Sequence, residues 1–156
     1  MMNRMLSVLS SKLRRLLFVT AAAFPILSAC KTTPKTVTLD VVCFNYLERP
    51  IFEIFIDNKA GDSSNPYPAT GGSTISGVRL ALGPKRVTWR LDGPAGSPGN
   101  GETVVARNMP VLANVAPDAE FLAIHIYPDE TVELIPSRHY PRATEKGRIM
   151  ASAAQR

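Results

Sequence analysis

The sequence predicts an all-β protein, an antiparallel β-sandwich of six to seven short strands that follows a cleaved signal peptide. Three observations predict this fold. Several runs of five to nine residues alternate apolar and polar side chains with the period of two that a half-buried strand requires. Turn-forming residues separate these runs, with 10 glycines and 13 prolines in 156 residues. No long run carries the apolar spacing of an amphipathic helix, so helices are not expected to form the framework.

The first 29 residues have the three zones of a secretory signal peptide. Met1–Arg15 holds four basic residues and no acidic ones, Leu16–Leu27 is a twelve-residue run that is apolar apart from Thr20 and Pro25, and small residues follow. A membrane-spanning helix requires about 20 apolar residues, so this run is too short to span a bilayer. A buried helix of the domain is the alternative, and Pro25 together with the absence of a polar face argues against it.

The four residues Leu27–Cys30 end this segment. Their sequence, Leu-Ser-Ala-Cys, resembles the lipobox of bacterial lipoproteins at all four positions. The resemblance implies that the chain is cut before Cys30 and that Cys30 is acylated, which anchors the protein to a membrane because two or three acyl chains hold it far longer than one. Residues 30–36 would then be a lipidated tether. Lys31, in place of the aspartate that tends to retain enterobacterial lipoproteins at the inner membrane, favours the periplasmic face of the outer membrane.

Removal of the signal peptide changes the charge of the protein. The full chain has 18 basic and 13 acidic residues, a net charge of +5. Residues 1–29 hold four of the basic residues and no acidic one, which leaves 14 against 13, or +1. A nucleic-acid partner is therefore not predicted. With Cys30 acylated, Cys43 has no intramolecular partner, so a buried and inert thiol is expected, with an intermolecular disulfide as the alternative.

Residues 37–136 carry the predicted strands of an immunoglobulin- or transthyretin-like sandwich. Their ranges are 37–43, 51–57, 78–82, 85–91, 103–107, 120–128 and 131–136. Gly83-Pro84 is predicted to turn a hairpin between the third and fourth of these strands, and Asp129-Glu130 to turn one between the last two. Trp89, the lone tryptophan, is expected in the core.

Two long loops and a tail complete the predicted domain. Residues 58–77 and 92–102 are rich in Gly, Pro, Ser and Asn and are predicted to be loops, the second of them flexible. Residues 137–156 are predicted to be a basic, largely unstructured tail with a helical turn near 148–154. The basic residues of this tail are interpreted either as solvated or as a contact for phosphate head groups or an acidic partner.

The sequence contains few of the reactive groups that an enzyme needs. His125 alternates with Ile124 and Ile126, so its side chain is expected on the opposite face from theirs, and a surface or half-buried histidine is predicted. Catalytic residues, metal ligands and cofactors are therefore predicted to be absent, and the protein is not expected to be an enzyme. A small hydrolase that uses His125 with an acid from the Asp129 turn is the alternative.

A stretch in the first half of the domain resembles a known family. The residues that carry the resemblance are Asn45, Tyr46, Arg49, Pro50 and Ile51, then the aromatic-rich run 52–57, then Gly61, Gly71, Gly72 and Trp89. Over residues 41–91 the chain is similar to small proteobacterial lipoproteins whose domains begin Asn-Tyr-x-x-Arg/Lys-Pro-Ile and that are found beside phospholipase effectors of type VI secretion. Many members carry cysteines after the glycine pair. This chain has Thr74, Ile75 and Ser76 there, so any disulfide role is lost.

The resemblance implies an immunity protein, which binds and neutralises a phospholipase effector in the periplasm. The expected partner is that effector, and the unbound protein is expected to be monomeric. The exposure and the unusual backbone of the two loops single out Tyr67, Pro68, Ser97 and Asn100 as the predicted partner-binding residues. The alternative functions are a structural or assembly lipoprotein of an envelope secretion machine and a small ligand-binding or hydrolytic lipoprotein.

Overall fold

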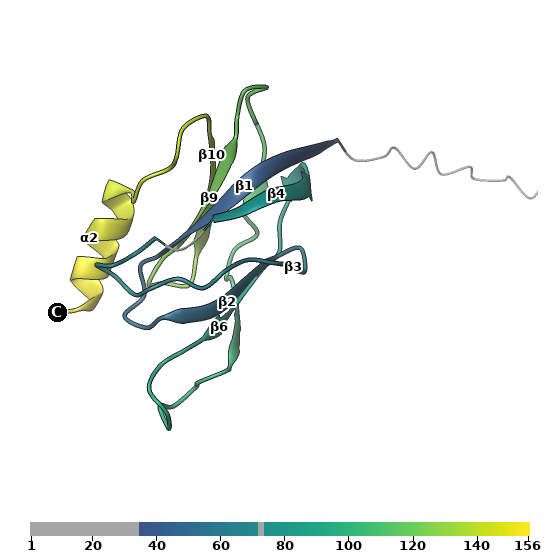
Figure 1. Cartoon of the computed structure of the whole chain (residues 1–156). Helices are drawn as coiled ribbons and strands as arrows, with labels where there is room; N and C mark the ends of the chain where they lie inside the picture. The colour runs from purple at the N-terminus through teal and green to yellow at the C-terminus, as the bar shows by residue number, and fades with distance from the viewer. Residues whose placement is uncertain (1–34, 72–73) are drawn as a thin grey trace, which may run out of the picture. The chain divides into compact units, whose positions relative to one another are not determined.

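Two four-stranded sheets pack face to face in the computed structural model of the protein (Figure 1). The structure describes residues 35–71 and 74–156. The predicted signal peptide 1–29, the lipidation site Cys30 and most of the tether 30–36 lie outside the described residues. Within them strands form the framework and the all-β prediction is confirmed.

The first sheet has the strand order β10-β9-β1-β4. Its strands are β1 (Thr36–Asn45), β4 (Thr74–Ala81), β9 (Phe121–Ile126) and β10 (Val132–Ser137). The pairs β1–β4 and β9–β10 are antiparallel, and the predicted turn between the last two strands is confirmed. β1 and β9 are the exception to the predicted antiparallel pairing, because they run in parallel. A parallel pair needs a long crossover connection, and residues 46–120, which include the whole second sheet, provide it.

The second sheet is antiparallel throughout, with the order β3-β2-β6-β7. Its strands are β2 (Ile51–Ile56), β3 (Lys59–Ala60), β6 (Val87–Leu91) and β7 (Thr103–Val105). Asp57 and Asn58 turn the β2–β3 hairpin with φ values of 50° and 61°, the left-handed pair that a two-residue hairpin loop favours. A short separate ladder pairs β5 (Gly83–Pro84) with β8 (Val111–Leu112).

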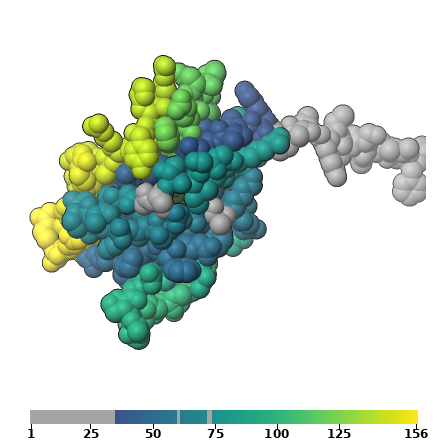
Figure 2. Space-filling view, in the orientation of Figure 1, coloured from purple at the N-terminus to yellow at the C-terminus, as the bar shows by residue number. Residues whose placement is uncertain are grey.

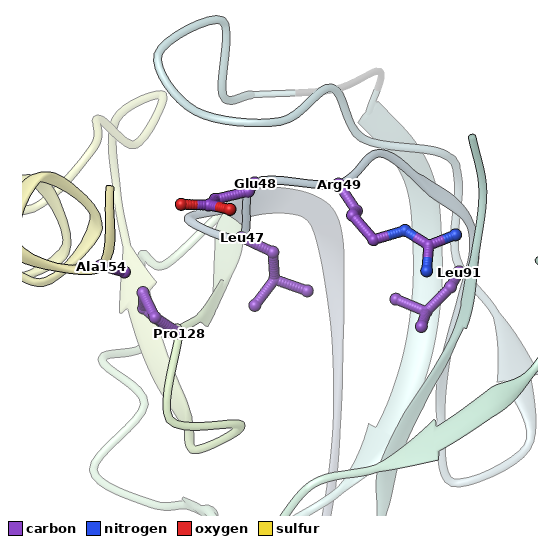
Figure 3. A pocket seen from close by; sticks show the side chains of 6 residues that line it. All are labelled: Leu47, Glu48, Arg49, Leu91, Pro128 and Ala154. Carbon is purple, nitrogen blue, oxygen red and sulfur yellow. The ribbon is translucent and has the colours of Figure 1, made fainter. Parts of the chain in front are cut away.

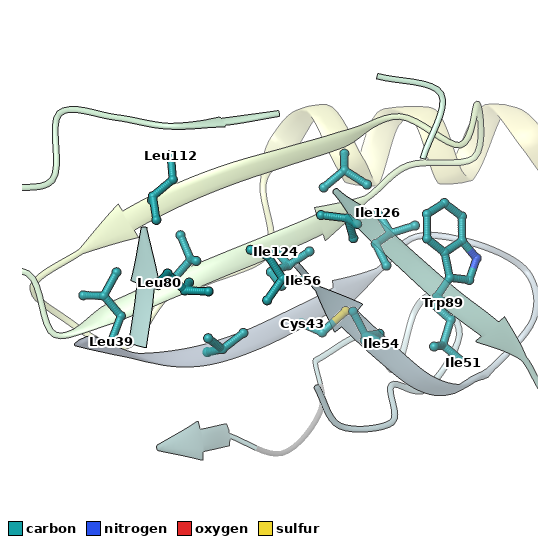
Figure 4. Close-up of a cluster of buried hydrophobic side chains, with 14 residues drawn as sticks. Leu39, Cys43, Ile51, Ile54, Ile56, Leu80, Trp89, Leu112, Ile124 and Ile126 are labelled. Atoms are coloured by element: carbon teal, nitrogen blue, oxygen red, sulfur yellow. The ribbon is translucent and has the colours of Figure 1, made fainter. Parts of the chain in front are cut away.

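The core lies between the two sheets, and alternate residues of each strand enter it (Figure 4). Trp89 on β6 is fully buried there, as predicted. Cys43 on β1 is also buried, and it is the free cysteine of the described residues. Burial raises the pKa of the Cys43 thiol, which keeps the sulfur protonated and weakly nucleophilic.

The predicted hairpin around Gly83-Pro84 is wrong. β4 ends in the first sheet and β6 begins in the second, so these residues carry the chain from one sheet to the other. The crossing is held by Lys85, whose side chain is 3% exposed and whose Nζ lies 2.6 Å from Oδ2 of Asp57. A Gly-Pro pair suits a hairpin and a crossing equally well, and the local sequence does not say which sheet each flanking strand joins.

The prediction of a largely unstructured tail at residues 137–156 is also wrong. β10 extends to Ser137, and the helix α2 (Glu145–Ala154) packs against the outer face of the first sheet. Thr144 caps the helix, because its side chain accepts a hydrogen bond from Gly147 N at 3.1 Å. The fully buried residues of α2 are the small Gly147 and Ala151, with Met150 partly buried beside them, so its packed face carries few of the large apolar side chains that reveal an amphipathic helix. Over residues 35–71 and 74–156, no helix is long and apolar enough to cross a membrane.

Gly147→Ala is expected to destabilise the protein, although alanine favours a helix over glycine by about 1 kcal/mol. A Cβ at position 147 would overlap the buried Tyr46 ring, and overpacking of this kind costs about 1–3 kcal/mol or more. Urea unfolding would measure the change in the free energy of unfolding. Ser152→Ala, on the exposed side of the same helix, is the control and should change it by less than about 0.5 kcal/mol. A Gly147→Ala protein as stable as the parent would contradict the packing of α2 on Tyr46.

Candidate functional site

The turn that joins β1 to β2 organises one end of the domain. Asn45, the last residue of β1, is buried and closes the turn. Its Nδ2 donates to the carbonyl oxygen of Arg49 at 2.7 Å, and its Oδ1 accepts a hydrogen bond from Leu47 N at 2.9 Å. An Asn side chain that bonds the backbone two residues ahead stabilises a turn locally. The turn therefore sets the direction in which Glu48 and Arg49 leave the sandwich.

Arg49 ties the loop 92–102 to this turn. Its guanidinium donates to the carbonyl oxygen of Asp92 at 3.1 and 3.3 Å, to that of Pro98 at 2.6 Å, and to Oδ1 of Asn100 at 2.6 Å. A planar guanidinium can reach several acceptors at once, which a lysine ammonium on its flexible stem cannot do with the same geometry. The loop was predicted to be flexible from its Gly and Pro content, and these bonds instead hold it in one conformation.

Asn100 and Ser97, two of the predicted partner-binding residues, lie in this loop. The Asn100 Nδ2 donates to the carbonyl oxygens of Gly93 and Pro94 at 3.0 and 2.8 Å. Both ends of the Asn100 amide are therefore used inside the loop, where they support its shape. Ser97 is half-buried and lines a hollow between the loop and the turn.

Tyr67 and Pro68, the other two predicted residues, reach the same turn from the first long loop. Tyr67 N donates to the carbonyl oxygen of Leu47 at 3.2 Å. The Tyr67 ring is half-buried against a cluster that contains Phe44 and Tyr46, so it is less available than an exposed aromatic anchor would be. Pro68 is exposed and follows a cis peptide bond. The structure thus brings Tyr67, Ser97 and Asn100 to one turn, and Pro68 follows Tyr67 as the more exposed residue of that pair.

Two shallow hollows flank Glu48 and Arg49. The first, of about 340 Å³, is lined by Leu47, Glu48, Arg49, Leu91, Pro128 and Ala154 (Figure 3). The second, of about 450 Å³, is lined by Glu48, Arg49, Pro50, Asp92, Gly93, Pro94, Ser97 and Pro98. Glu48 and Arg49 are the residues that the two hollows share. We call this surface, the turn 46–50 with the two hollows, the loop end of the domain.

None of the sequence predictions gave Glu48 a role. Arg49 entered them only as part of the motif that resembles the lipoprotein family. The sequence did offer one signal for Arg49: an arginine beside a proline at the start of a strand has few local hydrogen-bond partners, so its acceptors are expected elsewhere in the chain. Its acceptors lie more than forty positions away in the loop 92–102, and local pattern carries no information about such a contact.

The loop end lies opposite the point where the chain enters the domain. Thr36 begins β1, and the turn 46–50 follows its last residue. Ten extended residues span about 30 Å, so β1 separates the two ends by its whole length. Figure 1 shows this run of β1, and Figure 2 shows the loop 92–102 protruding from the surface away from the start of β1.

His125, the other candidate for chemistry, is enclosed. It is 1% exposed, so the prediction of a surface or half-buried histidine is wrong, although its side chain does lie on the face opposite Ile124 and Ile126. Its ring stacks on Phe44 with centroids 4.9 Å apart, and its Nδ1 lies 3.1 Å from the Tyr46 hydroxyl. α2 closes this region from outside, because Thr144 N donates to the same hydroxyl at 2.7 Å.

Burial favours the neutral form of His125. The pKa of His125 is lowered to about 4, chiefly by burial; the charge of Glu133 opposes this shift and the charge of Lys146 adds to it. Glu133 accepts a hydrogen bond from the Tyr127 hydroxyl at 2.6 Å, and this bond together with Lys146 lowers the pKa of its carboxyl. Lys146 also lies 4.1 Å from the centre of the Tyr127 ring. The acid near His125 is therefore Glu133 on β10 and not one from the Asp129 turn. Through Lys146, the interactions of Glu133 and Tyr127 hold α2 on the sheet.

Neither a set of metal ligands nor similarity to known proteins assigns a function to the loop end. In the part of the chain that the structure describes, no three His, Cys, Asp or Glu side chains gather as metal ligands would. No family model and no curated protein matches the chain. Among solved structures, an NMR structure of a protein from Eubacterium rectale is similar, with 11% identity, a TM-score of 0.38, and coverage of 67% of this chain and 93% of that one.

Acidification is expected to weaken the fold through His125. Its pKa of about 4 in the folded protein lies below the value of about 6.5 in an unfolded chain, so the unfolded chain binds more protons between these values. The contribution of neutral His125 to the free energy of unfolding should therefore be fully present above pH 6.5. The free energy of unfolding should fall by about 3 kcal/mol as the pH drops to 4. Urea unfolding across this range would measure the slope.

His125→Phe keeps the ring stack and should remove most of that slope between pH 6.5 and about 4.5, above the range where carboxylates titrate. His139→Gln, an exposed site, is the matched control and should keep it. An unchanged slope in His125→Phe would contradict a buried neutral His125.

Arg49→Lys is expected to loosen the loop 92–102 while the sandwich stays folded. The amides of Gly101 and Glu102 donate within this end of the domain, to Leu91 O at 2.9 Å and Gly99 O at 3.0 Å. Their hydrogen exchange should become at least about ten-fold faster, because a lysine cannot donate to the three oxygens that the Arg49 guanidinium reaches at once. Arg86→Lys, an exposed arginine outside the loop, is the control. Unchanged exchange at both amides would show that Arg49 does not hold the loop.

Proposed function

We propose that the protein is a lipid-anchored binding protein of the bacterial envelope that neutralises a phospholipase effector of type VI secretion. The observation that supports this most is the gathering of two long loops around one turn, at the end of the domain opposite the entry of the chain. A binding surface needs exposed, shape-defined segments on a rigid scaffold. The identity of the partner rests on the resemblance of residues 41–91 to immunity lipoproteins.

The anchor and the binding surface would not compete for space. Cys30 precedes Lys35 by five residues, a reach of at most about 18 Å when extended. A lipid on Cys30 would hold the start of β1 near the bilayer and leave the loop end free. A periplasmic effector that approaches its phospholipid substrate would then meet the loops before the anchor.

Neutralisation would work by obstruction. A loop that Arg49 already holds in one conformation loses little conformational entropy when a partner orders it, so more of the contact energy appears as affinity. The loop 92–102 would insert at the mouth of the effector's active site, with the hollows beside Glu48 receiving side chains from its rim. Tyr67, Pro68, Ser97 and Asn100 would shape the surface, Asn100 from within.

Co-expression tests the proposal directly. The proposal expects a phospholipase effector among the products of the adjacent genes. Expressed in the periplasm, that effector should arrest growth, and co-expression of the full-length protein should restore growth. Replacement of residues 94–99 by a glycine-serine segment of equal length should abolish the rescue, because it removes the shaped loop and leaves the core intact. Glu120→Gln, beside Asp40 in the middle of β1 and outside the loop end, should rescue fully. Growth arrest that the full-length protein does not relieve would refute an immunity function. Co-purification of the protein with subunits of a secretion machine would favour an assembly role.

A further inference from the structure

Glu48 is an exposed carboxylate at the centre of the loop end. Neither an ion pair nor a hydrogen bond engages its side chain within residues 35–71 and 74–156, in contrast to the neighbouring Arg49. Figure 3 shows the Glu48 side chain directed toward Pro128 and Ala154, while Arg49 extends the other way, toward Leu91. The two side chains therefore leave the turn in different directions, and only Glu48 offers its charge to a ligand.

The charge of Arg49 is directed into the domain. Its N–H groups donate to backbone and amide oxygens of the loop. The Glu102 carboxylate borders the same Gly99 backbone as the Arg49 guanidinium, so a negative charge lies beside it. The remaining ionised side chains that line the hollows are Glu48 and Asp92, both exposed. The surface that a ligand meets is therefore negative.

The lining between these charges is apolar. Leu47, Leu91, Pro128 and Ala154 line the first hollow, and Pro50, Pro94 and Pro98 line the second. A carboxylate at the rim of an apolar surface suits a side chain with an aliphatic stem and a cationic end, since the stem covers the apolar surface and the cation reaches the carboxylate. Shallow hollows with a polar rim are typical of protein interfaces, whereas small-molecule sites enclose most of their ligand.

We propose that the loop end binds a protein segment in which an arginine or lysine stands between apolar residues, with its cation on Glu48 and its apolar neighbours in the two hollows. The inference rests on the proposed function for the identity of the partner, because the segment would belong to the effector. It adds the chemistry of that segment. Anionic ligands, including phosphate head groups, would be repelled by Glu48 and Asp92.

Tripeptides test this chemistry without the effector. The probe is acetyl-Leu-Arg-Leu-amide, with acetyl-Leu-Gln-Leu-amide and acetyl-Leu-Glu-Leu-amide as matched comparisons, titrated into the ¹⁵N-labelled domain from Lys31 onward. This segment contains every residue of the described core, so it folds without the signal peptide. The arginine peptide should give saturable chemical-shift changes at the backbone amides of residues 47–49, 91–93, 97 and 154. It should bind about three- to five-fold more tightly than the glutamine peptide, as expected for an exposed ion pair, and the glutamate peptide should bind least.

Two variants assign the effect to Glu48. Glu48→Gln should make the arginine and glutamine peptides equivalent, and Glu120→Gln, the same substitution outside the loop end, should preserve the preference. Equal binding of all three peptides by the parent protein, shifts elsewhere on the surface, or a preference that survives Glu48→Gln would each overturn the inference.

The growth assay separates this inference from the proposed function. Arginine-selective binding together with a failed rescue would refute immunity and leave the site standing. A rescue that Glu48→Arg retains would refute the site and leave immunity standing. A rescue that Glu48→Arg abolishes, with arginine-selective binding by the parent, supports both.

Discussion

The connection between β1 and β2 holds three separate parts of the domain in place. Asn45 closes the turn with hydrogen bonds from its own amide. Tyr46 turns its hydroxyl to the capping residue of α2 and packs its ring under the helix. Arg49 holds the loop 92–102, and Ile51 enters the core as the first residue of β2. The Asn-Tyr-x-x-Arg-Pro-Ile pattern therefore has a structural reason at each of these positions, since every one of these side chains fixes a different neighbour.

Periodicity was sufficient to predict the parts of the fold that depend on neighbouring residues. Alternating side chains identified most of the longer strands, although β3 and the first half of β4 lie in the predicted loop 58–77. Trp89 and Cys43 proved to be buried because each stands on the apolar side of its strand. The β9–β10 hairpin followed from the acidic turn between two such runs. The position of His125 opposite two isoleucines also followed from alternation, but its burial did not, because burial depends on what covers the outer face of the sheet.

The remaining features depend on contacts between distant residues or on side chains too small to leave a pattern. The parallel pairing of β1 with β9 and the crossing at Gly83-Pro84 depend on which sheet each strand joins, which alternation does not encode. Only a helical turn near 148–154 was predicted where α2 forms, because the fully buried residues of the helix are the small Gly147 and Ala151. At the loop end, loop composition located Ser97 and Asn100, whereas the contacts of Arg49 that give the loop its shape link positions far apart in the chain.

The basic residues near the C-terminus contribute to holding this segment on the domain. Arg138 pairs with Asp118 at 3.5 Å, and Lys146 pairs with Glu133 at 3.4 Å. Both pairs are substantially exposed, so each contributes little by itself, and the packing of α2 on the aromatic side chains contributes the greater part. The interpretation of these residues as a contact for phosphate head groups is thereby less favoured, because two of the charges are already paired within the domain.

The packing of α2 has a consequence for how the protein matures. Tyr46 lies near the start of the described chain and Gly147 near its end, so the outer aromatic face of the first sheet is covered only when the last residues have been synthesised. A chain that stops before Thr144 leaves Phe44, Tyr46 and Tyr127 exposed to water, and exposed surface of this kind draws chaperones and proteases. The outer face of the first sheet is therefore closed only in a chain that extends through α2.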